Sequence, residues 1–227
     1  GMHDFAEKNP DKFYDVAIAE QHSMTFAAGV AKEGKKPILA IYSTFLQRAY
    51  DQLIHDVALQ KLDVTLAIDR AGFVGGDGAT HAGIFDVSYL RCIPNMIIMC
   101  PSDENECWKM LSTGYNYQGP AAVRYPRGEG PGTEILKNFD LLEVGKARVI
   151  NETSSDLVIL SFGNMLDLSL EIADQINCSL IDMRFIKPLD EELIEKCAKK
   201  YKHIITIEEN VISGGAGSAV NEYLSKI

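Results

Sequence analysis

The sequence lacks any long hydrophobic run. None of its apolar stretches approaches the roughly 18 residues that a membrane-spanning helix needs, and no secretory signal is visible. Basic residues are also few, since 22 lysines and arginines stand against 32 acidic residues, a net charge of −10. Because a nucleic-acid surface must neutralise phosphates, this charge argues against nucleic acid as a partner. We therefore expect a cytoplasmic protein that binds neither membranes nor nucleic acid.

Cysteine is scarce as well. The five cysteines are odd in number and scattered, and no two of them form a Cys-x-x-Cys pair. This pattern indicates neither a disulfide framework nor a zinc site. We expect buried or idle thiols in a reducing compartment. The five residues are Cys92, Cys100, Cys107, Cys178 and Cys197.

Apolar runs alternate with stretches of helical spacing along the whole chain. Runs typical of buried strands cover residues 13–18, 37–42, 64–68, 96–100, 121–123, 157–162, 179–185 and 203–207. Helical spacing follows most of them, at 20–34, 43–58, 102–110, 166–176, 190–201 and 219–224. Repeated strand and helix units with short connections predict mostly parallel sheets that helices cover on both faces.

The fold class that this alternation predicts is α/β, with two mostly parallel α/β domains. Residues 1–128 form the first domain, and a Gly/Pro/Glu-rich stretch within 129–141 is interpreted as a linker. Residues 142–227 begin the alternation again and form the second domain.

Several predicted helix ends carry recognisable residues. Ser43-Thr44, Asp103 and Asp190 are expected to cap helix starts, and Gly34 is expected to follow the end of the first helix. The segment Gly214–Gly217 is similar to a phosphate-binding turn, but its spacing differs from the dinucleotide fingerprint. An ordinary helix start is the better interpretation of that segment.

Glu20 lies where a predicted strand, Phe13–Ile18, runs into a predicted helix. Ligands of open α/β sheets bind at the carboxyl ends of the strands, so a carboxylate there is a candidate for ligand chemistry. The alternative is a simple helix charge, because acidic residues are favoured in a first helical turn by the macrodipole. The spacing alone leaves both interpretations open.

Two arginines and a glycine-rich loop are further candidates. Arg70 and Arg127 come just after predicted strands, at the same sheet edge as Glu20 if the strands are parallel, and paired guanidinium groups suit a phosphate or carboxylate. The loop Gly72–Gly83 matches no helix or strand pattern and contains an aspartate and a histidine. An ordinary surface turn remains the alternative for this loop.

Nine segments together resemble the 1-deoxy-D-xylulose-5-phosphate synthases, which belong to the transketolase-like thiamine diphosphate enzymes. The resemblance covers essentially the whole chain. It implies a transketolase-like pyrimidine-binding domain followed by a transketolase-type carboxy-terminal domain. The segments are 15–22, 41–52, 55–60, 67–72, 89–94, 101–106, 123–128, 182–185 and 214–217.

The resemblance implies roles around thiamine diphosphate. Glu20 matches the family's acid that hydrogen-bonds the ring nitrogen of the aminopyrimidine and is expected to be catalytic. Phe45 matches the aromatic residue that stacks on the pyrimidine, a contact worth about 1 kcal/mol beyond area burial. Arg48 is expected to bind the cofactor, and His81 is expected to take part in catalysis.

The resemblance also implies the reaction. The family decarboxylates pyruvate and joins the two-carbon unit to D-glyceraldehyde 3-phosphate, which gives 1-deoxy-D-xylulose 5-phosphate, a precursor of isoprenoids, thiamine and pyridoxal. Tyr42, Arg70 and Arg127 match positions that bind the phosphate of the acceptor aldehyde. Asp77 and His81 match further substrate-binding positions.

One departure from the family pattern concerns magnesium, which related enzymes hold through a Gly-Asp-Gly motif and a later asparagine in a separate domain. Gly76-Asp77-Gly78 mimics the triplet and Asn105 follows it, but the triplet lies in the pyrimidine-side loop and Asn105 in a predicted helix. We therefore expect no metal ligand in this chain. Together with the start at Gly1-Met2, this predicts a fragment that is inactive alone, with Mg²⁺ held by a missing domain and a homodimer in the intact enzyme.

Two alternatives remain open. Transketolases and the β subunits of 2-oxo-acid dehydrogenases share this two-domain half, although Arg70, Arg127 and the Tyr-Ser-Thr-Phe-Leu-Gln-Arg run at 42–48 favour the synthase. From another class, the chain could be a non-catalytic dimerisation or binding module.

Overall fold

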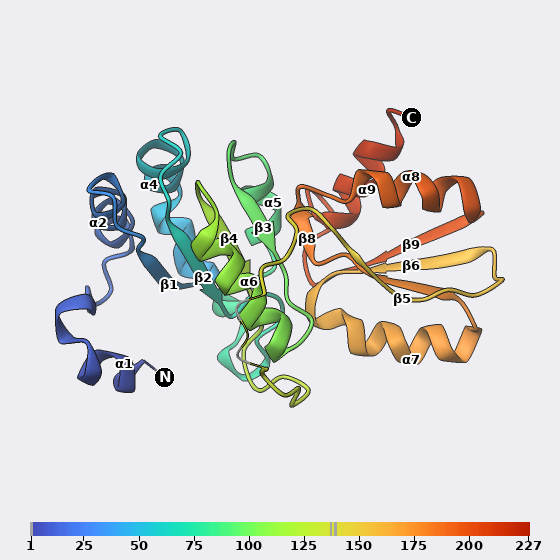
Figure 1. The fold of residues 1–227 in the computed structure, drawn as a ribbon, viewed down its shortest axis with the longest axis horizontal. Coiled ribbons are helices and arrows are strands. Elements are labelled where there is room, and N and C mark those ends of the chain that lie inside the picture. Colours follow the sequence, from blue (N-terminus) through green and yellow to red (C-terminus); the bar gives the residue numbers. More distant parts are fainter. Residues whose placement is uncertain (1, 137, 139) are drawn as a thin grey trace.

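Two β-sheets lie side by side in the computed structural model, which describes residues 2–136, 138 and 140–227 (Figure 1). The order of the first sheet is β1-β2-β4-β3-β8, and that of the second is β5-β7-β6-β9. Parts of the predicted linker, residues 137 and 139, lie outside the described residues, as does Gly1. The strands are β1 (Ile38–Tyr42), β2 (Thr65–Asp69), β3 (Ile97–Met99), β4 (Ala121–Arg124), β5 (Arg148–Asn151), β6 (Leu157–Ser161), β7 (Ser179–Asp182), β8 (Phe185–Lys187) and β9 (His203–Ile207).

Most strand pairs are parallel. Only β8 in the first sheet and β5 in the second run antiparallel to their neighbours among the described pairings. The predicted α/β class with two mostly parallel sheets is therefore confirmed. No helix of the described part of the chain is long and apolar enough to cross a membrane.

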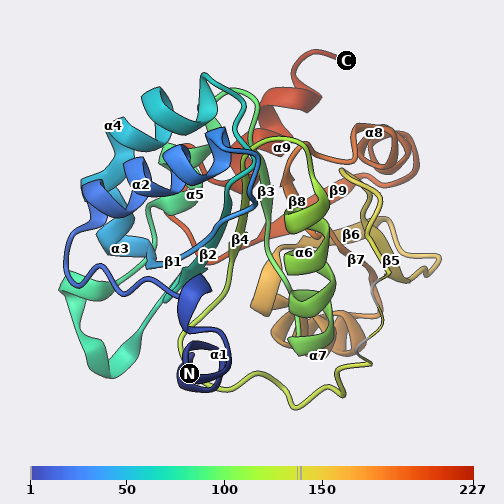
Figure 2. The same ribbon diagram turned by 60° about the vertical axis from the view of Figure 1, so that its left-hand side comes forward.

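Helices cover both faces of both sheets (Figure 2). Helices α2 to α5 lie on one face of the first sheet and α6 on the other, while α7 lies opposite α8 and α9 on the second sheet. The helices are α1 (His3–Lys8), α2 (Glu20–Lys32), α3 (Ser43–Leu46), α4 (Tyr50–Gln52), α5 (Asp86–Arg91), α6 (Glu104–Asn116), α7 (Leu166–Ile176), α8 (Glu191–Lys200) and α9 (Ala216–Leu224). A π-helical turn, Leu53–Ala58, extends α4.

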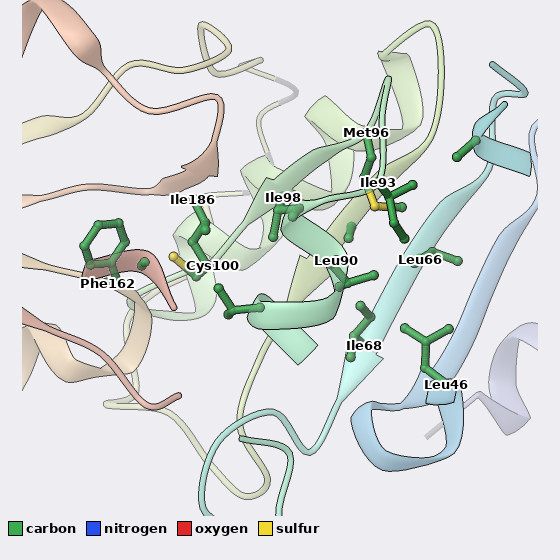
Figure 3. Close-up of a cluster of buried hydrophobic side chains, with 14 of the residues drawn as sticks. Leu46, Leu66, Ile68, Leu90, Ile93, Met96, Ile98, Cys100, Phe162 and Ile186 are labelled. Atoms are coloured by element: carbon green, nitrogen blue, oxygen red, sulfur yellow. The ribbon is translucent and has the colours of Figure 1, made fainter. Parts of the chain in front are cut away.

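The apolar runs of the strands are explained by this two-sided burial. Leu66 and Ile98 lie in one core with Leu90 of α5 (Figure 3), whereas Met99 packs with Met110 of α6 on the other face. A strand that is covered on both faces needs apolar residues at successive positions, not at alternate ones. This is why the strands of both halves were recognisable in the sequence as continuous runs.

The larger core continues from one sheet to the other. Cys100 at the end of β3, Phe162 after β6 and Ile186 on β8 belong to a single buried cluster (Figure 3). On the far face of the second sheet, Ile159 packs with Ala173 of α7. The two halves of the chain therefore share apolar packing and are not separate globules.

Several predicted helix ends are confirmed. The carboxylate of Asp103 accepts from the backbone N–H of Glu106 at 2.8 Å, and Asp190 accepts from Leu193 at 3.1 Å. Gly34 follows α2 with a φ of 75°, in the left-handed region that glycine adopts freely. The Ser43-Thr44 cap is wrong, because α3 begins at Ser43 itself and its N-cap position makes no side-chain bond.

The predicted strand over Phe13–Ile18 is also wrong. This segment is irregular and pairs with no described strand. Asp15 accepts from the backbone N–H of Ala17 at 2.9 Å, and Ala17 has a φ of 53°, so the backbone turns where an extended run was expected. The apolar composition of the run is typical of a buried strand, but Ile18 is 88% exposed.

The predicted strand over residues 179–185 is divided in two. Strand β7 ends at Asp182, whose carboxylate accepts from the backbone N–H of Arg184 at 3.2 Å, and Arg184 has a φ of 55°. The chain then crosses to the first sheet, where β8 pairs with β3. Strand β5 and helices α1 and α5 are further elements that the sequence patterns did not reveal.

A group of buried charges joins the two halves near this crossing. Glu106 of α6 is 1% exposed, and its carboxylate lies 2.8 Å from Nε and 3.0 Å from Nη2 of Arg184. Nearby, Arg148 of β5 donates to Asp182 at 2.9 Å, and burial raises the pKa of the Asp182 carboxyl. Arg148 and Asp182 both belong to the second sheet, so it is Glu106 that joins the halves, through Arg184 and through Nη1 of Arg148 at 3.9 Å.

We expect Glu106→Gln to lower the free energy of unfolding by about 2–4 kcal/mol, because it removes the charge that a mostly buried Arg184 pairs with. Urea denaturation followed by circular dichroism measures the change. A matched control is Glu152→Gln, since Glu152 pairs with Lys200 at the surface at 3.3 Å and such pairs contribute about 0–1 kcal/mol. Equal, small losses in both variants would contradict the structural role of the buried pair.

Candidate functional site

Three neighbouring strands of the first sheet end at one edge, and a side chain of the site comes from each end. Tyr42 closes β1, Arg70 directly follows β2, and Arg127 comes soon after β4. The guanidinium carbon of Arg70 lies 3.8 Å from the centre of the Tyr42 ring. The order β1-β2-β4 therefore brings together residues that are far apart in the sequence.

An aromatic group lies beside these arginines. The rings of Tyr42 and Phe45 are stacked, with centroids 5.1 Å apart and an interplanar angle of 22°. The ring of His81 meets Phe45 edge-on at 5.4 Å. Helix α3 starts directly after β1, which brings the rings of Tyr42 and Phe45 side by side. Together the two half-buried rings form a continuous apolar surface.

Asp77 lies between the two arginines. Its Oδ2 atom accepts from Nε of Arg70 at 2.9 Å and lies 2.9 Å from Nε of Arg127. Partial burial of Asp77 opposes ionisation, but the two guanidinium groups prevail and hold the pKa of its carboxyl below its ordinary value. The site therefore places one ionised carboxylate between two guanidinium groups.

Asp69 is a residue of this site that sequence reasoning missed. Its carboxylate accepts from the backbone N–H of Arg70 at 2.6 Å and from Nη1 at 2.7 Å. This double contact supports Arg70, whose φ of 58° lies in the left-handed region. The direct succession of Asp69 and Arg70 at a strand end was the signal that could have revealed it.

The glycine-rich loop contains no strand and no α-helix, as predicted, and consists of two 3₁₀ turns. Its ends are joined, because Gly72 and Gly83 exchange backbone hydrogen bonds of 2.7 and 2.8 Å. Between these ends the loop carries Asp77 and His81 to the arginines and to Phe45.

The remaining two predicted site residues have no hydrogen bond, ion pair or ring contact with this group among the described residues. Glu20 is the first residue of α2 and is half-buried, and Arg48 is exposed after α3. Among the residues that the structure describes, neither side chain has a hydrogen bond or ion pair. Six predicted site residues are thus brought together: Tyr42, Phe45, Arg70, Asp77, His81 and Arg127.

The start of α9 carries no free anion site. The backbone N–H groups of Ala216 and Gly217 donate to the carboxylate of Glu208 at 2.7 and 2.8 Å. The helix amides that could bind a phosphate are therefore occupied by the chain's own side chain. This confirms the interpretation of Gly214–Gly217 as an ordinary helix start.

Across residues 2–136, 138 and 140–227, no three His, Cys, Asp or Glu side chains form a group that could hold a metal ion. The five cysteines are free thiols, and three of them are buried. Asp77, in the Gly-Asp-Gly triplet, is engaged by guanidinium groups.

Both halves of the chain match known domain families. Residues 1–133 match the transketolase pyrimidine-binding domain, and residues 145–227 match the transketolase C-terminal domain. The chain is 60% identical, over 98% of its length, to 1-deoxy-D-xylulose-5-phosphate synthase of Pseudomonas entomophila (strain L48). It is 59% identical over 99% of its length to the synthase of Cellvibrio japonicus (strain Ueda107). The chain spans only 35% of the length of each of these relatives.

Two solved structures have the same fold. A split-gene transketolase, described as an inactive β4 tetramer, is 31% identical with a TM-score of 0.88 and covers 98% of this chain and 74% of its own. A transketolase from Campylobacter jejuni has a TM-score of 0.66 over 90% of this chain and 36% of its own, and at 20% identity it supports the fold alone. The resemblance inferred from the sequence motifs is confirmed, and the chain belongs to the transketolase family.

Proposed function

We propose that this chain is the pyrimidine-binding and carboxy-terminal part of a thiamine-diphosphate-dependent 1-deoxy-D-xylulose-5-phosphate synthase. The observation that carries the proposal is the 60% identity to such synthases over 98% of the chain. The substrates are then pyruvate and D-glyceraldehyde 3-phosphate. The same similarity favours a synthase over a transketolase, a 2-oxo-acid dehydrogenase β subunit or a non-catalytic binding module.

The residues of the site fit the pyrimidine part of thiamine diphosphate. Phe45 offers a half-buried ring for stacking, and Glu20 offers a carboxylate that no other described side chain uses. When bound, thiamine diphosphate stabilises the negative charge on the two-carbon unit after carbon dioxide leaves. Glu20 would hold a proton at a ring nitrogen of the pyrimidine, and exposed Arg48 would add positive charge toward the cofactor.

The two arginines fit the phosphate of the acceptor aldehyde. Arg70 is held in place by Asp69 and lies against the ring of Tyr42, whereas Arg127 is 46% exposed and open to solvent. A phosphate accepts paired hydrogen bonds from guanidinium groups, and it would have to compete with Asp77 for them. Asp77 would thereby make binding selective for a dianion. His81 contacts Phe45, on which the cofactor pyrimidine would stack, so it would lie near the reacting end of the substrate.

The chain offers no described metal site, so magnesium and the diphosphate would be held by the portion of the relatives that lies outside the alignment. The split-gene transketolase, described as an inactive β4 tetramer, supports a chain that associates with itself but does not react alone. We propose a homodimer for the intact enzyme and a cytoplasmic location, without nucleic-acid or membrane partners.

The 227-residue chain alone should be inactive and should bind thiamine diphosphate weakly, because the described residues include no metal site for the diphosphate end of the cofactor. Isothermal titration calorimetry with thiamine diphosphate and Mg²⁺ measures the affinity. Low-micromolar binding by this chain would contradict the proposal that the diphosphate and magnesium are held outside it. Recovery of pyruvate decarboxylation on addition of the relatives' amino-terminal portion would support it.

In the full-length protein, Glu20→Gln should lower kcat by roughly 10²–10⁴-fold while the melting temperature stays within a few degrees. Glutamine has nearly the same shape, but it cannot hold the proton as a carboxylate does. The measurements are steady-state kinetics and deuterium exchange at the thiazolium carbon of the cofactor. Glu33→Gln, just after the other end of α2, is the matched control and should change neither. An unaltered exchange rate in Glu20→Gln would remove Glu20 from the mechanism.

Arg127→Ala should raise the KM for D-glyceraldehyde 3-phosphate roughly ten- to a hundredfold and leave the KM for pyruvate nearly unchanged. The reason is that a charge-assisted bond, worth about 1.5–3 kcal/mol, is lost only to the phosphorylated substrate. Arg127→Lys should restore part of the affinity, because lysine keeps the positive charge but cannot donate two parallel hydrogen bonds to the phosphate. Unphosphorylated glyceraldehyde is the control substrate, and an equally large loss with it would count against a phosphate clamp.

A further inference from the structure

The glycine-rich loop is attached to the molecule through a narrow neck. Gly72 and Gly83 exchange two backbone hydrogen bonds there, and the residues between them extend outward. Gly83 has no room for a side chain, since a Cβ would lie 2.1 Å from the carbonyl oxygen of Arg70 and 2.7 Å from Cβ of Ser43. The neck is therefore tightly packed on its β1 and β2 side.

On its other side the neck is packed against the second half of the chain. A Cβ on Gly72 would lie 2.3 Å from Oε2 of Glu209, so the glutamate side chain lies directly on the glycine backbone. The same Oε2 atom accepts from Nδ2 of Asn164 at 2.8 Å, which holds the carboxylate in that position. Glu209 follows β9, and Asn164 lies between β6 and α7, so both belong to the carboxy-terminal half.

Arg124, at the end of β4, connects the neck to Glu209. Its side chain is 5% exposed, and its Nε lies 2.9 Å from Oδ2 of the fully buried Asp86. Its Nη2 atom donates to the carbonyl oxygen of Glu209 at 3.2 Å and also faces that of Gly83 at 3.5 Å. One buried guanidinium group therefore contacts both the neck and the carboxy-terminal segment behind it.

The segment Glu209–Ser213, which we name the support segment, continues this contact. The backbone N–H of Val211 donates to the carbonyl of Ile84, directly after the neck, at 2.9 Å. Asn210 donates to Oγ of Ser88 at 2.9 Å, and Ser88 donates to the carbonyl of Ser213 at 2.7 Å. The support segment thus follows the chain that leaves the loop.

The loop beyond the neck depends on these contacts. Most of residues 73–82 are exposed or half-buried, and only Val74 is buried. The side chains that the loop presents, Asp77 and His81, reach Arg70, Arg127 and Phe45 from a backbone with little packing of its own. A small rotation at the neck would move both side chains relative to the arginines.

We propose that Glu209 and Arg124 are positioning residues, through which the carboxy-terminal half sets the place of Asp77 and His81 at the acceptor site. This inference rests on the proposed function for the identity of the substrate. It assigns a task in acceptor binding to the carboxy-terminal half, which contributes none of the predicted site residues.

The competing explanation is that these contacts merely hold the two halves together. Arg91 provides a matched control for this explanation, because it too joins the halves but, among the described residues, has no hydrogen bond to Gly72, Gly83 or Glu209. It donates to the carbonyl oxygens of Gly214 and Gly215 at 2.9 and 3.0 Å and pairs with Glu222 at 2.7 Å. Adhesion alone predicts similar effects of Arg91→Ala and of a change at the neck.

Hydrogen–deuterium exchange of the 227-residue chain tests the structural part. Glu209→Ala should speed exchange in peptides that contain Gly72 and Gly83 by about tenfold, an opening easier by about 1.4 kcal/mol, and leave peptides from β2 and β4 unchanged. Arg124→Lys, which keeps the charge but cannot reach all three acceptors, should act in the same direction. Arg91→Ala should leave the neck unaffected. Equal exchange at the neck in Glu209→Ala and the parent would overturn the proposal.

Kinetics of the full-length protein test the functional part. Glu209→Ala should raise the KM for D-glyceraldehyde 3-phosphate several-fold and lower kcat to the extent that His81 is displaced. The KM for pyruvate should stay close to that of the parent, and Arg91→Ala should change none of these values. If the KM values for both substrates rose equally and the melting temperature fell, the role of Glu209 would be merely structural and the proposal would be overturned. If the parent protein lacked synthase activity, the proposed function would fail, whereas the exchange rates would still decide whether Glu209 holds the loop.

Discussion

Parallel pairing of β1, β2 and β4 is the constraint on which the site depends. The pairing places Tyr42 opposite Asp69 and aligns Ile68 with Arg124, so the three strand ends lie at one level. Parallel strands require connections that cross over the sheet, and here those connections supply α3 and the glycine-rich loop. Because the register fixes the strand ends to within one residue, Tyr42 and Arg70 start from neighbouring positions at the same level of the sheet.

Charge then decides how this edge is used. Guanidinium groups from two strand ends would repel each other if left alone, and Asp77 compensates by binding both. The carboxylate is supplied by a loop, not by a strand. Strand ends thus supply the two positive charges, and the loop supplies the negative charge between them.

The sequence allowed part of this arrangement to be predicted. Arg70 and Arg127 were placed at one edge because parallel strand ends must coincide, and Asp103 and Asp190 were recognised as caps because capping is local. The bridge made by Asp77 was not predictable, since a loop without periodicity does not reveal which groups it reaches. Likewise, Phe13–Ile18 had the composition of a strand, but a strand needs a neighbour, and that depends on the whole fold.

The crossing of β8 has a consequence for how this half of the protein could have been assembled in evolution. The edge of β3 is covered by a strand that arrives from beyond the second sheet's β7. A shorter ancestor that ended before Phe185 would have exposed a row of unpaired backbone groups, and such edges invite aggregation. Transfer of the carboxy-terminal unit between genes would therefore expose the edge of β3, unless β8 stayed with the first sheet or another strand replaced it there.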